Sequence, residues 1–185
     1  EAAWSIGMIA FESLLPLRLE EFLGSSREAG ATMGPVAALG WAIFSVGTFL
    51  AGVASRRLGV ARAAMLGRLL NGAGAVIMGL APGPASLIAA YFFTYAAHGL
   101  NGPPHSALLH REAVASNRST VLSMNSMMAF LAFGVGAPLA GLLADSASIA
   151  IAMIVVGAIS LLGVACYLPA RRAELARPAV SPVIP

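Results

Sequence analysis

This sequence has few charged residues. Only 10% of its 185 residues are Asp, Glu, Lys or Arg, whereas soluble proteins carry about 25%. With 58% hydrophobic residues and a mean hydropathy of +0.84, the chain has too few polar side chains to cover a surface in water. The composition predicts a protein surrounded by lipid, and it argues against a nucleic-acid-binding protein despite the pI near 9.8.

Lysine is absent, and the single cysteine, Cys166, has no second thiol to pair with. All eleven Lys or Arg residues are arginine, and alanine is abundant, which indicates a GC-rich bacterial genome. We therefore expect the protein to lie in a bacterial plasma (inner) membrane. The sequence has no zinc-spaced His/Cys set, no phosphate loop and no nucleophile elbow, and His105 and His110 are not spaced as a helical metal pair. We therefore expect no cofactor, no metal site and no enzymatic activity.

Six apolar runs follow one another, each about long enough to cross a bilayer as a helix. They cover about residues 2–17, 35–54, 63–80, 87–109, 120–143 and 149–168. The sequence thus predicts an all-α membrane protein whose bundle fills residues 1–170. We expect a break in the fourth run at Gly99–Pro104, and a disordered cytoplasmic tail over the proline-rich residues 171–185.

The arginines predict how the chain is threaded. Arg18 and Arg27 fall on one side, beside acidic residues, and the other nine fall on the opposite side: Arg56, Arg57, Arg62, Arg68, Arg111, Arg118, Arg171, Arg172 and Arg177. Loops rich in arginine stay in the cytoplasm, so both chain ends are predicted to be cytoplasmic. Arg68 lies inside an apolar run and is expected to reach the cytoplasmic interface with its long side chain.

An internal repeat links the two halves of the chain. Residues 44–52 read FSVGTFLAG and residues 133–141 read FGVGAPLAG, which match at six of nine positions with an offset of 89. Because this offset contains three crossings, the two triplets have opposite orientation. The sequence therefore predicts six transmembrane helices as 3+3 inverted repeats, an arrangement common in halves of secondary transporters.

Two sets of polar residues at membrane depth are candidate sites for substrate or protons. Glu12 is a carboxylate within an apolar run, where burial costs about 2.5–3.5 kcal/mol even on lenient scales, so we expect a proton carrier or, alternatively, a headgroup contact near a helix end. The fourth run carries a polar stripe within an arc of about 140°. It comprises Tyr91, Thr94, Tyr95, His98, Asn101, His105 and Ser106. A single stripe predicts the lining of a water-filled cavity.

The loop after the second run resembles a family signature. Gly52, Arg57 and Gly59 match the loop that follows the second helix of each half in the major facilitator superfamily. Arg56 stands where the signature has Asp, and Arg62 is one step from the expected basic pair. The fifth run also resembles the glycine–proline pattern of the antiporter branch, through Gly134, Gly136, Pro138 and Gly141.

The resemblance implies the C-terminal six-helix half of a twelve-helix secondary transporter. It further implies a missing N-terminal six-helix half, a small-molecule substrate, proton-coupled export and alternating access. The loop would act as a gate whose arginines pair with carboxylates of the neighbouring bundle; alternatively, they only contact lipid phosphate. Two other interpretations remain: a half-size, dimerising six-span carrier or scaffold, and an intramembrane enzyme with His98 or His105 as base.

Overall fold

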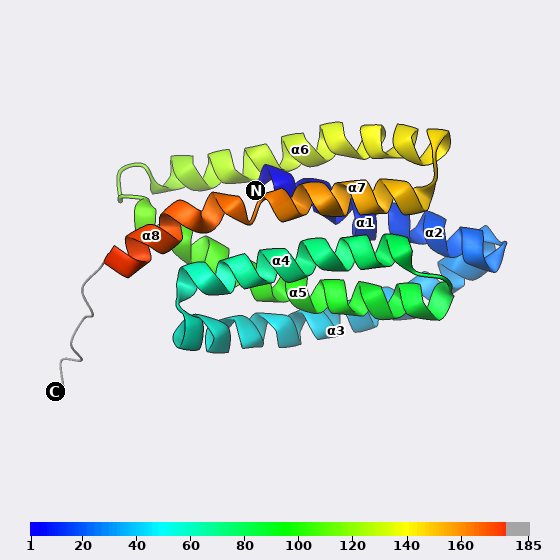
Figure 1. Cartoon of the computed structure of the whole chain (residues 1–185), viewed down its shortest axis with the longest axis horizontal. Coiled ribbons are helices and arrows are strands. Elements are labelled where there is room, and N and C mark those ends of the chain that lie inside the picture. Colours follow the sequence, from blue (N-terminus) through cyan, green and yellow to red (C-terminus); the bar gives the residue numbers. More distant parts are fainter. Residues whose placement is uncertain (177–185) are drawn as a thin grey trace.

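The protein is a bundle of long helices, as seen in a computed structural model that describes residues 1–176 (Figure 1). Within these residues all regular structure is helical, which confirms the predicted all-α class. The elements are α1 (Ala2–Glu12), α2 (Leu14–Leu23), α3 (Ser26–Leu58), α4 (Val60–Leu80), α5 (Pro84–Glu112), α6 (Arg118–Ser146), α7 (Ile149–Leu162), the 3-10 helix η1 (Ala165–Tyr167) and α8 (Leu168–Ala176).

Five helical segments in this part of the chain are long and apolar enough to cross a membrane. They are Ala2–Leu23, Ser26–Leu58, Val60–Leu80, Arg118–Ser146 and Ile149–Ala176. The long helix outside this set is α5, which carries the polar stripe. The protein is an integral membrane protein, and α5 is the long described helix that lacks a sufficiently apolar stretch of this length.

The helices extend beyond the apolar runs that predicted them. α3 begins at Ser26 rather than near residue 35, because Ser25 caps it by accepting a hydrogen bond from the N–H of Glu28. Arg56 and Arg57 in its last turn suit the negative end of the helix dipole. Residues 171–176, expected to be disordered, belong to helix α8, and the rest of the predicted tail lies outside the described residues.

The first membrane segment is interrupted at a single residue, which the sequence analysis did not predict. Ser13 separates α1 from α2 with φ −113°. Pro16 explains the break, because its nitrogen has no hydrogen to donate to the Glu12 carbonyl and its ring crowds that oxygen. The break expected in the fourth run is wrong: α5 continues through Pro103 and Pro104, since prolines inside a well-packed membrane helix bend it more often than they end it.

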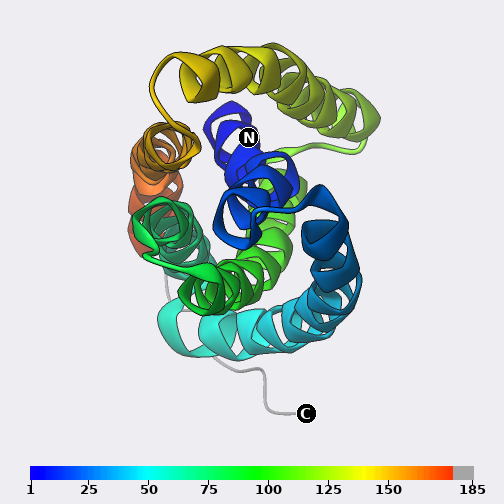
Figure 2. The ribbon, with the colours of Figure 1, turned by 90° about the vertical axis from the view of Figure 1, so that its right-hand side faces the viewer.

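The connections alternate between the two ends of the bundle (Figure 1). The α3–α4 and α5–α6 connections and α8 lie at one end, and the α2–α3, α4–α5 and α6–α7 connections lie at the other. Viewed end-on, α3 and α6 lie on opposite sides (Figure 2). Only 17% of the most apolar stretch of α3 and 6% of that of α6 are buried. These two helices therefore offer their surface to lipid or to another bundle.

Glycine contacts hold the bundle together at close range. A Cβ atom on Gly47 of α3 would overlap the Ala96 carbonyl oxygen of α5, and one on Gly99 of α5 would overlap the Phe44 carbonyl oxygen of α3. Such reciprocal contacts let two backbones touch, as in other membrane helix pairs.

The predicted packing set of α6 fits this role only in part. A Cβ on Gly136 would lie 3.0 Å from Ile9 of α1, whereas one on Gly134 or Gly141 would meet nothing within 4 Å. Pro138 is exposed. Within the described residues, only Gly136 of this set packs against a helix, because the remaining face of α6 points away from the bundle.

We expect Gly47→Ala to lower the melting temperature by several degrees, because the added methyl group must push α3 away from α5. Overpacking of this kind costs about 1–3 kcal/mol. Gly134→Ala is the matched control: it adds the same group in open space and gains about 1 kcal/mol of helix propensity. Thermal unfolding of the protein in detergent measures both, and equal melting temperatures would contradict the α3–α5 contact.

Candidate functional site

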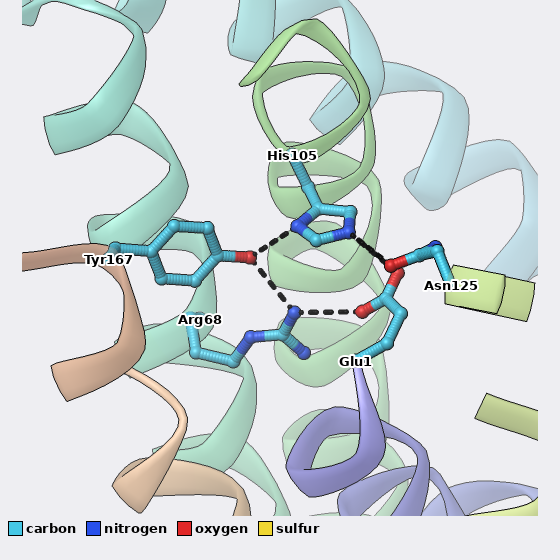
Figure 3. Close-up of polar contacts among 5 residues, drawn as sticks. All are labelled: Glu1, Arg68, His105, Asn125 and Tyr167. Carbon is cyan, nitrogen blue, oxygen red and sulfur yellow. Dashed lines mark hydrogen bonds and ion pairs between the residues drawn. The ribbon is translucent and has the colours of Figure 1, made fainter. Parts of the chain in front are cut away.

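A cluster of five polar side chains joins four elements and the residue before α1 inside the bundle (Figure 3). One Arg68 nitrogen, Nη2, lies 3.2 Å from Glu1 Oε2 and donates to Tyr167 Oη at 3.0 Å. His105 Nδ1 is 2.8 Å from Tyr167 Oη, while its Nε2 is 3.1 Å from Glu1 Oε1 and 3.2 Å from Asn125 Oδ1. The residue before α1 is thus tied to α4, α5, α6 and η1 at one point.

Arg68 is buried, which corrects the expectation that it reaches the cytoplasmic interface. Only 2% of it is exposed. An unpaired charge in such a place costs several kcal/mol, so a partner of opposite charge is required. Glu1 provides it. The pair therefore neutralises itself within the bundle, and Arg68 does not belong with the arginines at the α3–α4 and α5–α6 ends of the bundle.

Both ring nitrogens of His105 have polar partners in the cluster. The Tyr167 oxygen accepts from Arg68, so its hydroxyl hydrogen is free to point at Nδ1, and the Nε2–H then faces Glu1 and Asn125. The Glu1 carboxylate oxygen Oε1 lies 3.1 Å from Nε2 and can accept from this N–H.

Glu12 lies at the break between α1 and α2 and is exposed. Its Oε1 accepts a hydrogen bond from the Tyr95 hydroxyl at 2.8 Å. Tyr95 is itself held edge-on by Phe11 and Trp41, with ring centroids 5.5 and 5.7 Å away. The structure brings together two of the predicted residues beside the one-residue interruption between α1 and α2. The sequence signal for it was Pro16.

His98 lies in an aromatic box rather than in the cluster. Its ring stacks on Trp4 at 5.2 Å and contacts Phe11 and Phe44 at 5.5 and 5.2 Å. Its Nδ1 atom is buried without a hydrogen-bond partner in the described part of the chain. The Arg68 guanidinium lies 5.5 Å from the other ring of this stack, Trp4, so the box borders the cluster.

The polar stripe of α5 divides between two neighbours, and not all of it lines one cavity. Thr94 is fully buried against Gly74 of α4, and Asn101 packs against Gly67 of the same helix. Tyr91 instead packs against Gly40 of α3. An arc of 140° on a central helix is wide enough to meet more than one partner. Tyr95, His98 and His105 are the members that contact residues at or near α1.

The predicted gating loop is held by a carboxylate, though not through its arginines. Gly59 turns the chain between α3 and α4 with φ +87°, a conformation suited to glycine. Glu174 of α8 accepts hydrogen bonds from the N–H groups of Val60 and Ala61 at 3.0 and 2.9 Å, and pairs with Arg111 of α5 at 3.2 Å. The start of α4 is thereby fastened to α5 and α8.

The other loop residues of the prediction lie at this end without such contacts. Arg56, Arg57 and Arg62 are exposed and form no ion pair within residues 1–176, and Gly52 lies one turn before Arg56. Sequence reasoning missed Glu1, Tyr167 and Glu174, whose partners are 62 to 114 positions away. Arg68 alone, in a run without a nearby carboxylate, signalled that a distant acidic partner was needed.

Apolar helices of membrane length around paired ionisable groups are typical of membrane proteins that move solutes. The sequence profile of the Major Facilitator Superfamily matches residues 2–185, so the chain belongs to this family. No curated protein sequence matches the chain.

Among solved structures, the chain is similar to a crystal structure of a mutant of the peptide transporter POT in complex with sulfate. The TM-score is 0.77 at 17% sequence identity, and the match covers 95% of this chain and 37% of that one. The chain thus spans little more than a third of the length of this relative. At such low identity, the likeness shows a shared fold.

We expect Arg68→Gln to destabilise the protein by about 3–5 kcal/mol, because it leaves the Glu1 carboxylate buried without its cation. Arg62→Gln, at an exposed position, is the control and should change stability by no more than about 0.5 kcal/mol. The double variant Glu1→Gln/Arg68→Gln should recover part of the loss, since neither charge remains. Denaturation midpoints in detergent measure all three, and a harmless Arg68→Gln would contradict the pairing.

Proposed function

We propose that this chain is the C-terminal six-helix half of a secondary active transporter, which works by alternating access against an N-terminal six-helix half. Membership of the family and the coverage of 37% of a related transporter support this proposal. So do the mostly uncovered faces of α3 and α6. Its partners are the lipid bilayer, the other half, a small-molecule substrate and protons.

The six spans form 3+3 inverted repeats in this proposal, and the helix bounds support it. Shifting α3 (26–58) by 89 residues gives 115–147, against 118–146 for α6. Shifting the first residue of α4, 60, gives 149, where α7 begins. The packing agrees as well: Gly47 meets α5 at Ala96, and its counterpart Gly136 meets α1 at Ile6 and Ile9, which flank the counterpart of Ala96.

Protons are the coupling ion in this proposal, and the observation that carries it is the Glu1–Arg68–His105 cluster. A histidine between a carboxylate and a tyrosine hydroxyl can exchange one proton inside the bundle. Ionisable groups in such positions mark proton relays in pumps and transporters. Glu12, with Tyr95 as donor, is the second carboxylate on the pathway. The direction proposed is export against proton entry.

The protein lies in a bacterial plasma membrane in this proposal, with both chain ends in the cytoplasm. Seven arginines lie at or next to the end that holds the α3–α4 connection: Arg56, Arg57, Arg62, Arg111, Arg118, Arg171 and Arg172. Arg18 lies at the opposite end, within 3.5 Å of the Ala81 carbonyl. This asymmetry is the one that the positive-inside rule associates with the cytoplasm.

Orientation can be tested by labelling single cysteines in intact cells, in a Cys166→Ala background. A cysteine at Leu58 should resist a membrane-impermeant maleimide, because it faces the cytoplasm, whereas one at Gly83 in the α4–α5 connection should react. Labelling at Leu58 and protection at Gly83 would reverse the proposed threading.

Proton coupling can be tested by comparing His105→Gln with His110→Gln, an exposed histidine on the same helix. In vesicles with an imposed pH gradient, we expect wild type and His110→Gln to accumulate a transported solute, drawn from a panel of radiolabelled small molecules, and a protonophore to stop this. His105→Gln should lose accumulation by tenfold or more and keep downhill exchange, because the proton site is lost and the solute path is not. Undiminished accumulation in His105→Gln would refute the assignment.

A further inference from the structure

Helices α1 and α6 enclose a groove of about 450 Å³, which is within the range of small-molecule sites, about 300–1,000 Å³. Trp4, Met8 and Glu12 line it from α1, and Asn125, Phe130 and Phe133 line it from α6. Glu1 contributes at one end. The groove therefore has apolar walls with a carboxylate toward each end.

The charged residues that line this groove are all acidic. No arginine or histidine is among its lining residues. The charge of Glu1 is balanced by Arg68 and shared with His105 behind the groove wall. Glu12 has no cation within the described chain and accepts only the neutral Tyr95 hydroxyl. One negative charge is thus left for a ligand to neutralise.

The walls suit an apolar body beside that charge. Phe130 is 78% exposed and Phe133 is half-buried. Aromatic faces attract cations through their quadrupole, and the attraction grows when water is excluded. Met8 adds an adaptable apolar surface on the facing helix. Trp4 differs, because His98 already covers one face of its ring.

We propose that the α1–α6 groove binds a small organic cation with an aromatic or aliphatic body, whose positive charge pairs with Glu12. This inference rests on the proposed transport function, since it assigns the class of substrate. An organic cation fits better than a metal ion, because hard metal ions require several oxygen ligands. The described residues contain no group of three metal-ligating side chains.

The test is equilibrium binding of radiolabelled tetraphenylphosphonium to the purified protein, without any ion gradient. We expect saturable binding by wild type and an affinity at least tenfold lower for Glu12→Gln, which keeps the shape and the Tyr95 hydrogen bond but loses the charge. Glu28→Gln, at the start of α3 and outside the groove, is the matched control and should bind as wild type.

Two further measurements distinguish an effect of ligand charge on binding from effects of groove shape and of misfolding. Tetraphenylborate has the same body with the opposite charge, and it should not displace the phosphonium. Ala129→Phe, which fills the groove from α6 and changes no charge, should also weaken binding by tenfold or more. If Glu12→Gln does not fold, Glu12→Asp and Ala129→Phe decide: binding kept by the first and lost by the second supports the site.

Equal affinity in wild type, Glu12→Gln and Ala129→Phe would overturn the proposal, as would displacement by tetraphenylborate. These outcomes leave proton coupling untouched, because the His105→Gln comparison measures accumulation of any transported solute. Conversely, tetraphenylphosphonium binding that depends on Glu12, in a protein whose accumulation ignores the pH gradient, would keep the cation site and refute proton coupling.

Discussion

The fold depends on a guanidinium group that lies far from water. Arg68 reaches into the bundle from α4 with 2% of its surface exposed, and its charge is tolerable there only because Glu1 lies 3.2 Å away. That pairing fixes where the start of α1 sits relative to α4, and the hydrogen bond to Tyr167 fixes η1 beside both. His105 then completes the cluster from α5, so the helix that carries the polar stripe is positioned by the same charge.

Around this point, small residues set the distances between helices. Gly47 and Gly99 bring α3 onto α5, while Gly67 and Gly74 bring α4 onto the same helix. Lipid tails are as apolar as leucine, so membrane helices gain little from burying large side chains and associate through close contact instead. The close packing explains why Thr94 and Asn101 are buried in a helix interface rather than exposed to a cavity.

Features set by local sequence were predictable, and features set by distant partners were not. The hydropathy of the sequence was enough to predict the all-α class. Inside a bilayer the backbone must form its hydrogen bonds within the protein, and a helix does so within one segment. Helix ends required capping chemistry, such as Ser25 before α3, that lies outside the apolar runs. Tyr95 and Glu12 were both singled out, but their 2.8 Å hydrogen bond joins residues 83 positions apart. Glu174 gave no local signal of its role, since its partners lie at the start of α4 and at the end of α5.

The reciprocal glycine contact between α3 and α5 has a mechanical consequence. Two backbones in direct touch leave no soft side-chain layer to absorb a displacement, because packed interiors are nearly incompressible. α3 presents most of its length to its surroundings, so it receives any sideways load from lipid or from a neighbouring bundle. A displacement of α3 therefore moves α5 directly, and α5 is the helix that carries Tyr95, His98 and His105. Helix α3 is thus mechanically coupled to the polar residues of α5 at the centre of the protein.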